Sequence, residues 1–483
     1  MELERVNLFS ILDLRRRDVL FIYLLTLSAL FIFSFLSWSF FSGDFFHLRT
    51  ISYIEKARLA FQGFPPRLEN VGFVYPPLPV LLSILLPFPW LVQGVVGALI
   101  YMVMLYFGVK FYRSSYLLFA LLPLFLPFLY LALFRFDVLL LFFLISASTL
   151  LLLKYWEEGF SLYLFSAGFL FGIAFFIDFS AVFMAVFYSV VILLKRGASI
   201  SHRVGVALVF LVPSIFFFFF TLFVNFIFKD DPLYFLREYA SFFFQDIRVL
   251  QAKADFFTAV ALFIDYLQRS FPLLLPYVGG LLLVKRWRSY YLSPIFLIYL
   301  SPIFLSLLQI RYGFFTFSFS NSVIFTLFLL MFSNRLRLSP VIYILFLISA
   351  LLSPFVFLKS DDRNEVNFAR AFLGREFERN LTFYKEVAAQ VNSLNGKVLM
   401  DDRSLYPSVL FISDLSKLIL PYQYDFYPIL LAPCGKVDYV VGVAASGDAV
   451  YKMYPQITDF KLDGCRFYGR VGNAFIFSCS KCS

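Results

Sequence analysis

The sequence predicts a polytopic α-helical membrane protein with a C-terminal α/β domain outside the membrane. Hydrophobic residues account for 61% of the 483 positions. Such a composition is typical of a chain that crosses a bilayer several times rather than of a large soluble chain. The net charge of +10 comes from basic residues that punctuate apolar segments instead of forming one patch. They therefore indicate membrane topology, and nucleic acid is not expected as a partner.

About eleven apolar segments approach the ~20 residues that are needed to cross a bilayer. The segment at residues 77–88 is also apolar, but it is short and Pro87 interrupts it, so we expect a re-entrant or interfacial piece. The first span is too long for a signal-peptide core and no cleavage site follows it, so we expect it to remain as a transmembrane helix. The predicted spans are residues 18–41, 90–109, 115–134, 137–153, 160–177, 179–194, 204–228, 266–284, 291–309, 314–333 and 338–358.

The basic residues between these spans predict the orientation of the chain. If the N-terminus is cytoplasmic, every cytoplasmic loop carries Lys or Arg, from residues 15–17 to Arg335 and Arg337. The alternation persists through all the predicted spans. We therefore expect a multi-pass protein of the cell membrane with a cytoplasmic N-terminus and an extracytoplasmic C-terminal domain.

Two domains follow from the change in composition after the last span, namely residues 1–358 in the membrane and residues 359–483 outside it. Residues 359–396 are polar with apolar positions at helical spacing. Strand-like runs follow at residues 397–400, 418–420, 437–443 and 466–478, separated by turn residues. The pair Asp401-Asp402 comes directly after the first of these runs, as expected of a turn at the end of a strand.

All the cysteines of the chain fall in the predicted extracytoplasmic domain. An even number of cysteines outside the cytoplasm indicates disulfides, and several connectivities remain open. A hairpin centred near residues 471–472 would bring the second cysteine close to the third. Zinc remains an alternative because the last two are separated by two residues, although no second such pair supports it. The cysteines are Cys434, Cys465, Cys479 and Cys482.

Residues 42–78 form a polar loop after the first predicted span. Asp44 follows the span directly, residues 52–62 read as an amphipathic interfacial helix, and Tyr75 begins a Tyr-Pro-Pro-Leu stretch that restarts the apolar sequence. An ionisable group at the membrane edge is costly unless it faces water or a partner. Asp44 is therefore a functional candidate, with capping of the following helix as the alternative.

This order of elements resembles the first external loop of the GT-C superfamily, the membrane glycosyltransferases that use polyprenyl-phosphate sugars. The resemblance extends by layout over roughly residues 18–360 and implies that residues 42–78 are the catalytic loop of a GT-C-like domain. It implies that Asp44 is the base that takes the proton of the acceptor hydroxyl. His47, one turn later, and Tyr75 are then expected to bind substrate, with interfacial packing as the alternative for His47.

Arg135-Phe136-Asp137 resembles the Arg-Tyr-Asp of polyprenol-phosphate-mannose-dependent mannosyltransferases. On a helix this spacing sends the two charged side chains apart, so a simple mutual salt bridge is not implied. The alternative is an Arg that reaches toward lipid headgroups and an Asp that caps the next helix. The same family pattern continues with Gly168 and Gly172, a small-xxx-small helix face. It ends at Asp178, where relatives commonly carry Lys, so Asp178 is either a second acid or a helix cap.

Arg311-Tyr312 ends a later span and resembles the Arg-Tyr before a late helix of many GT-C enzymes. A guanidinium at headgroup depth suits a lipid phosphate because it stays charged and donates two parallel hydrogen bonds. We therefore expect Arg311, with Tyr312 beside it and with Arg135, to hold the phosphate of the donor. Simple extension of the Arg side chain to the headgroups is the alternative.

The resemblance implies an inverting glycosyltransferase, similar to mannosyltransferases and protein O-mannosyltransferases. Such an enzyme would move a single sugar from a polyprenyl-phosphate donor to a lipid-linked glycan or protein acceptor at the outer face of the bilayer. A single sugar is favoured over a whole glycan because the Trp-Trp-Asp motif of oligosaccharyltransferases is absent. No cofactor is implied with certainty, and a divalent metal remains open. The alternatives are a lipid or glycan transporter or flippase and a non-catalytic, glycolipid-binding scaffold.

Overall fold

The computed structural model describes residues 16–71, 76–111, 116–195, 199–235, 255–283, 294–312, 318–332 and 340–480. The chain divides into two compact units. The first, called the helical unit, comprises Met1–Ser37, Gln93–Phe220 and Gln245–Phe377. The second, called the mixed unit, comprises Trp38–Val92, Thr221–Phe244 and Glu378–Ser483. The predicted catalytic loop at residues 42–78 thus belongs to the same compact unit as the residues after 378.

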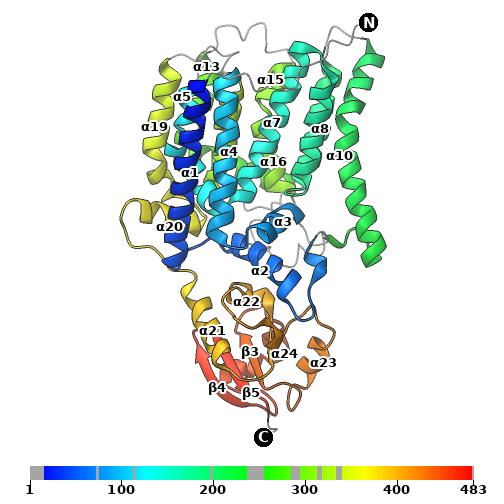
Figure 1. Ribbon diagram of the computed structural model, residues 1–483, viewed down its shortest axis with the longest axis vertical. Coiled ribbons are helices and arrows are strands. Elements are labelled where there is room, and N and C mark those ends of the chain that lie inside the picture. The colour runs from blue at the N-terminus through cyan, green and yellow to red at the C-terminus, as the bar shows by residue number, and fades with distance from the viewer. Residues whose placement is uncertain are drawn as a thin grey trace. The chain divides into compact units, whose positions relative to one another are not determined.

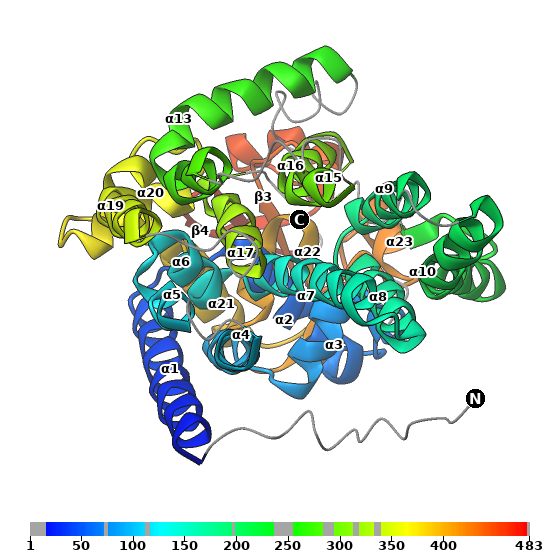
Figure 2. The ribbon, with the colours of Figure 1, turned by 90° about the horizontal axis from the view of Figure 1, so that it is seen from above.

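Helices make up the described part of the helical unit, and all but α20 are apolar. Figure 2 looks nearly along α4 and α19. α1, α4 and α10 each continue from one unit into the other. The helices are α1 (Arg16–Ser42), α4 (Pro89–Phe111), α5 (Tyr116–Ala120), η3 (Leu122–Leu124), α6 (Leu126–Phe134), α7 (Phe136–Glu158), α8 (Ser161–Phe175), α9 (Ser180–Leu194), α10 (Ile200–Lys229), α13 (Phe256–Leu283), α15 (Pro294–Tyr299), α16 (Ser301–Tyr312), η4 (Phe319–Ser322), α17 (Val323–Met331), α19 (Pro340–Phe357) and α20 (Arg363–Phe372).

Five helices among the described residues are long and apolar enough to cross a membrane: α1, α4, α7, α10 and α19. α10 exposes large side chains such as Phe216 at 62% and Phe219 at 60%, as expected of a helix that faces hydrocarbon. The eleven spans that the sequence predicts are not established. α8 and α9 are shorter apolar helices, and the predicted span at residues 115–134 is broken into α5, η3 and α6.

Close packing between α8 and α10 depends on the two glycines that the sequence places on one helix face. A Cβ atom on Gly168 would lie 1.9 Å from the carbonyl oxygen of Phe210, and one on Gly172 would lie 2.2 Å from the ring of Phe217. The hydroxyl of Ser214 donates to the Gly168 carbonyl at 2.8 Å. Small residues therefore let the two helix backbones approach closely enough for a direct hydrogen bond.

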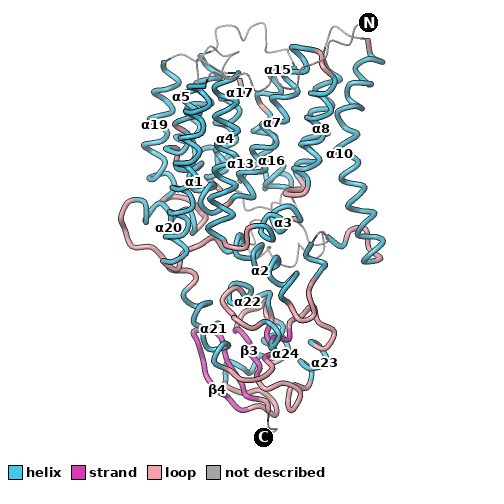
Figure 3. The backbone as a smooth tube through the Cα atoms, in the orientation of Figure 1, coloured by secondary structure: helices cyan, strands magenta, loops and turns pink. Residues whose placement is uncertain are grey.

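The mixed unit contains all the strands of the described residues (Figures 1 and 3). Its sheet has the order β2-β1-β3-β5-β4, in which β1 runs parallel to β2 and β3, while β5 is antiparallel to β3 and β4. The elements are α2 (Leu48–Gln62), η2 (Leu68–Val71), α3 (Pro77–Leu85), α21 (Thr382–Ser393), β1 (Val398–Met400), α22 (Asp402–Val409), η5 (Leu415–Lys417), β2 (Leu418–Ile419), α23 (Phe426–Leu431), β3 (Tyr439–Val443), α24 (Ala449–Met453), η6 (Pro455–Asp459), β4 (Arg466–Val471) and β5 (Ala474–Ser478).

α2 explains why the loop groups with the C-terminal residues. Leu59 of α2 is 1% exposed and belongs to the same hydrophobic cluster as Val387 of α21 and Met400 of β1. The predicted interfacial helix at residues 52–62 is longer than expected, and eleven of its fifteen residues are buried. The face of α2 that carries Leu59 is therefore packed against the C-terminal residues of the same unit by burial of apolar side chains.

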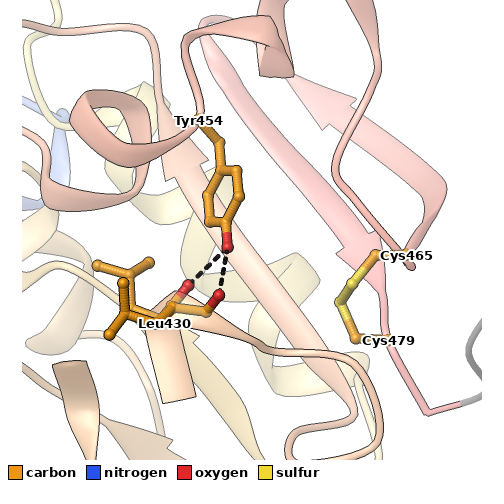
Figure 4. Close-up of a disulfide and its surroundings, with 5 residues drawn as sticks. Leu430, Tyr454, Cys465 and Cys479 are labelled. Carbon is orange, nitrogen blue, oxygen red and sulfur yellow. Dashed lines mark hydrogen bonds between the residues drawn. A yellow bond between two sulfur atoms is a disulfide. The ribbon is translucent and has the colours of Figure 1, made fainter. Parts of the chain in front are cut away.

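The predicted strand at residues 466–478 is a hairpin of β4 and β5. Gly472 turns the chain with a φ of 54°, a left-handed conformation that glycine adopts without steric cost. A disulfide joins Cys465 to Cys479, and nearby the hydroxyl of Tyr454 donates to the carbonyls of Leu430 and Leu431 at 2.9 and 3.1 Å (Figure 4). Cys434 is also disulfide-bonded, and Cys482 lies outside the described residues.

Candidate functional site

Asp44 sits in the turn that ends α1, and its backbone has a φ of 64°. Helices often end on a residue in this left-handed region, which is usually glycine. Asp tolerates the conformation better than most residues, but it still costs of order 1–2 kcal/mol relative to the right-handed one. Surrounding contacts must therefore hold the turn in place.

The N-terminus of α21 supplies those contacts. The amide of Leu381 donates to the Asp44 carbonyl at 2.9 Å, and the hydroxyl of Thr382 donates to the Asp44 carboxylate at 3.2 Å. The ammonium group of Lys385 forms an ion pair with the same carboxylate. A carboxylate at the start of a helix also interacts favourably with the helix dipole. The Asp44 side chain is still 24% exposed, so it remains partly accessible to solvent.

A side-chain amide fixes the next residues of the same turn. Asn380 accepts from the amide of Phe46 at 3.0 Å and donates to the carbonyl of Phe46 at 2.7 Å. Both bonds use backbone groups, so the side chain takes the place of a short β-ladder. Residues 44–46 and 380–385 are therefore tied together by side-chain and backbone bonds at once.

Two aromatic rings lie beside the ammonium group of Lys385. The ammonium lies 5.4 Å from the ring centre of Phe41 and 5.4 Å from that of Phe411. The two rings stack with their centres 5.9 Å apart. Aromatic faces attract a cation, so the rings and Asp44 together define where this ammonium sits.

Phe41 and Phe411 also line a groove of about 640 Å³ in the mixed unit. This volume falls in the range of small-molecule sites, about 300–1,000 Å³. Its walls come from the end of α1, from α2 and α3, from the turn before α4, and from the chain after α22. Arg58 is the charged residue among the side chains that line it, which are Phe41, Ile54, Ala57, Arg58, Phe61, Gln62, Ser83, Ile84, Pro87, Phe88, Pro89, Leu410, Phe411, Ile412 and Ser413.

A second polar cluster lies within the mixed unit, where α2 packs on α22 (Figure 1). Glu55 of α2 is 3% exposed, and burial followed by the nearby charge of Asp402 raises the pKa of its carboxyl well above the usual range. Arg67 donates to Glu69 at 2.7 Å and lies 3.8 Å from Asp402. Glu69 also pairs with Lys229 at the end of α10. Arg49, Glu55 and Lys56 of α2 are all buried and therefore face protein rather than water, whereas Arg58 is half-buried.

His47, not Asp44, caps α2. Its Nδ1 accepts from the amide of Arg49 at 3.3 Å, and the side chain is 8% exposed. Asp401 likewise caps α22 by accepting from Arg403 at 2.8 Å, and it also accepts from the amide of Ala449 at 2.7 Å. The pair Asp401-Asp402 is thus used inside the fold. Tyr75, the other residue predicted to bind substrate in this loop, lies outside the described residues.

Arg135 and Asp137 form a buried ion pair with a distance of 3.1 Å, at 2% and 0% exposure. The expectation that these side chains point apart was wrong. Arg135 has φ and ψ of −138° and 56°, so it interrupts the helix between α6 and α7 and turns its side chain toward Asp137. The side chain of Gln93 accepts from the amide of Phe136 at 2.9 Å and so takes the place of a backbone acceptor at the interruption of the helix.

The other predicted residues also belong to the helical unit. The carboxylate of Asp178 is buried and accepts from the amide of Ser180 at 2.8 Å, which is a cap at the start of α9. The guanidinium of Arg311 lies 5.4 Å from the ring of Tyr312, which stacks on Phe183 at 4.7 Å. Asp44 and His47 lie in the mixed unit, so the predicted residues are divided between the two compact units.

Glu365 of α20 is a buried carboxyl in the helical unit that the sequence did not single out. Its two oxygens accept from the amides of Phe319 at 3.1 Å and Ser320 at 2.6 Å, and from the hydroxyl of Ser360 at 2.5 Å. Burial, with a further contribution from Asp362, raises the pKa of Glu365 to about 7. The residue thus links α20 to the start of η4 through a group that titrates near neutral pH.

Comparison of the chain with protein-family models, with curated proteins and with solved structures gives no match. The case for a function therefore depends on the chemistry of the residues described above. Within the part of the chain that the structure describes, Asp44 combines a left-handed backbone, side-chain partners on its carboxylate and partial exposure to solvent. Residues held in this way concentrate at functional sites.

Proposed function

We propose that the protein is a GT-C-like glycosyltransferase that moves a single sugar from a polyprenyl-phosphate donor to a glycan or protein acceptor. Asp44 is the proposed general base. The observation that carries the proposal is the placement of this carboxylate, which Thr382 and Lys385 fix while its side chain stays partly exposed to solvent. The apolar groove that begins at the rings beside Lys385 belongs to the same compact unit.

In the proposed reaction, the oxygen of an acceptor hydroxyl attacks the anomeric carbon of the donor sugar. The bond between that carbon and the phosphate oxygen breaks, and the lipid phosphate leaves with the electron pair. The proton of the hydroxyl passes to the Asp44 carboxylate. Attack from the side opposite the phosphate inverts the anomeric centre. The chain thus contributes one positioned carboxylate, which acts as the base, and cations that stabilise the leaving phosphate.

The Asp44→Asn variant tests this proposal. Asn keeps the size of the side chain and also tolerates the left-handed backbone, so the turn at the end of α1 should persist. A neutral amide cannot take the proton, so sugar transfer should fall by roughly 10²–10⁴-fold. The assay is transfer from a panel of radiolabelled polyprenyl-phosphate sugars by the full chain in proteoliposomes.

The matched control is Asp414→Asn. Asp414 is exposed, belongs to the same unit, and caps η5 by accepting from the amide of Ser416 at 2.9 Å. This variant should transfer sugar at the parental rate. Transfer by the Asp44→Asn protein at that same rate would refute the assignment of the base.

One observation favours a second candidate, a non-catalytic scaffold that binds glycolipid. The Asp44 carboxylate is bound by Thr382 and Lys385, and the Asp44 carbonyl accepts from the amide of Leu381, so the ion pair also joins two distant parts of the chain. In a scaffold, Asp44→Asn would lower the melting temperature without removing any transfer activity, because the parental protein would have none. Measuring both quantities on the same preparations separates the two candidates.

The proposed orientation places the N-terminus in the cytoplasm and the C-terminal residues outside it, with about eleven spans in total. The support for this orientation is the alternation of basic loops in the sequence. A reporter that is active only in the cytoplasm should stay silent when it is fused after Ser483. Reporter activity there would place Asp44 on the cytoplasmic side and would contradict transfer at the outer face.

A further inference from the structure

Arg58 brings a positive charge into the apolar groove of the mixed unit. Its Nε donates to the side chain of Gln62 at 2.8 Å, its Nη1 donates to the carbonyls of Val409 and Leu410 at 2.9 and 2.8 Å, and its Nη2 donates to the carbonyl of Ser413 at 3.4 Å. Every acceptor is a neutral oxygen. Within the described residues, Arg58 has no carboxylate partner.

Such a charge is unfavourable in these surroundings. Burial lowers the pKa of Arg58, because a half-buried guanidinium loses part of its hydration. A charge taken out of water is stabilised fully only by a counter-ion. A guanidinium has five N–H donors, and the four bonds above leave one Nη2 hydrogen available. Arg58 can therefore bind an anionic oxygen without giving up its bonds to the protein.

The remaining charges nearby do not supply this counter-ion. Lys385, whose flanking rings line the groove, is a second cation, and its charge is balanced by Asp44. Arg58, Lys385 and Asp44 together leave one positive charge. Most of the groove wall is apolar, and Phe61 and Phe88 among its lining residues are 59% and 54% exposed. A ligand that complements this surface carries both an apolar chain and a negative headgroup.

We propose that this groove binds a lipid monophosphate with a single apolar chain, and that the phosphate is the counter-ion of Arg58. The inference rests on the proposed function, because it assigns a place to the lipid phosphate that such an enzyme would use. It names Arg58, a residue of the predicted catalytic loop, as a phosphate ligand that the sequence did not single out. Lys385 pairs with the proposed base, Asp44, and lies beside the rings of Phe41 and Phe411, which line the proposed lipid site.

The test measures equilibrium binding to the full-length protein in detergent, with farnesyl phosphate, farnesol and inorganic phosphate as probes. Farnesyl phosphate should bind at least about tenfold more tightly than farnesol, since a hydrogen bond to a charged group contributes about 1.5–3 kcal/mol and 1.4 kcal/mol is tenfold. Inorganic phosphate alone should bind too weakly to compete, because it lacks the chain that the apolar wall requires.

Two substitutions separate the charge of Arg58 from its structural bonds. Arg58→Gln keeps an N–H donor but removes the charge, so farnesyl phosphate should bind about as weakly as farnesol. Arg58→Lys restores the charge and should recover most of the preference for the phosphate. Arg403→Met, which removes an exposed Arg from α22 of the same unit, is the matched control and should bind like the parental protein.

The proposal is overturned if parental protein binds farnesol as tightly as farnesyl phosphate, or if Arg58→Gln keeps the parental preference. A short-chain phosphatidylglycerol that competes as well as farnesyl phosphate would overturn the assignment to a single-chain monophosphate. These outcomes do not depend on turnover. If the parental protein binds farnesyl phosphate through Arg58 but transfers no sugar, the proposed function alone is refuted. If Asp44→Asn loses transfer while Arg58→Gln binds farnesyl phosphate like the parental protein, this inference alone is refuted.

Discussion

The buried carboxyl of Glu365 should make the stability of the helical unit depend on pH. Its pKa in the folded chain is about 7, against an ordinary value of 4.5, and burial is the main cause. The folded state therefore keeps a proton on Glu365 in a pH range where the unfolded chain has released it. The stabilisation from this group is complete below pH 4.5 and is lost as the pH rises through 7.

The size of the effect follows from the two pKa values. One pKa unit corresponds to about 1.36 kcal/mol, so the free energy of unfolding should fall by roughly 2.5 kcal/mol between pH 5 and pH 8 on account of Glu365. The protonated carboxyl keeps its contacts, because Oε2 can donate to the hydroxyl of Ser360, 2.5 Å away. The charge that raises this pKa further belongs to Asp362, the residue that caps α20, whereas hydrogen bonds from Ser360, Ser320 and Ser318 lower it.

The Glu365→Gln variant isolates this contribution, because an amide is neutral at every pH in the range. The amide replaces an acceptor of the Phe319 or Ser320 amide, so the variant should be less stable than the parental chain at pH 5. That deficit should shrink by roughly 2.5 kcal/mol at pH 8, since the parental chain alone becomes charged. The assay is denaturant unfolding of both proteins in the same mixed micelles from pH 5 to pH 8.

The control is Glu376→Gln at an exposed glutamate a few residues beyond α20, which should show a constant difference across the pH range. Other buried carboxyls, such as Asp448 with a pKa of about 6, titrate in the same window but cancel when variant and parent are subtracted. A difference between Glu365→Gln and the parental chain that does not change with pH would refute the reasoning.

Two further predictions concern packing. Gly168→Ala should destabilise the chain by roughly 1–3 kcal/mol or more, because its Cβ would lie 1.9 Å from a backbone oxygen of α10. Gly205→Ala is the control and should be harmless, since nothing lies within 4 Å of the added Cβ. Equal melting temperatures of the two variants would contradict the close packing of α8 on α10. Replacing Cys465 and Cys479 together by Ala should lower the free energy of unfolding by about 3 kcal/mol, since the bridge spans a separation of 14 residues. The region around β4 and β5 should become more sensitive to protease. Unchanged proteolysis would show that strand pairing alone holds the hairpin.

The features that the sequence predicted well are those that depend on neighbouring residues. The apolar runs coincide with helices, and the strands β1, β2 and β3 start within a few residues of the predicted runs because period and turn residues are local signals. Gly168 and Gly172 likewise mark a close helix contact. The number of spans was not settled, since prolines at the starts of η3 and α6 divide an apolar segment that looks continuous in composition.

The candidate site was only partly predictable, because its residues meet across long separations. Asp44 stands out locally, at the junction of an apolar span and a polar loop. Lys385 is 341 residues away and belongs to an ordinary polar helix, so no spacing rule could pair it with Asp44. Arg58 looked like the water-facing side of an amphipathic helix, and only the packing of residues 409–413 reveals that it lines a groove.

The wrong expectation for Arg135 and Asp137 has a similar origin. It assumed an unbroken helix, in which residues two apart face different sides. The backbone of Arg135 leaves the helical region, and local geometry then allows a pair that the regular periodicity forbids. Ion pairs at helix junctions are therefore poorly predicted from spacing alone.

The mixed unit is assembled from three separate stretches of the chain, Trp38–Val92, Thr221–Phe244 and Glu378–Ser483. A ribosome releases the first stretch long before the last, so Leu59 and Glu55 must wait without their final neighbours while several apolar helices are inserted. The hydrogen bond between Thr382 and Asp44 closes across 338 residues. A chain that terminates early would present an uncovered α2, with an apolar side chain and a carboxyl that the complete protein hides. Exposed apolar surface makes an incompletely folded chain prone to aggregation, so only synthesis of the C-terminal residues removes this liability.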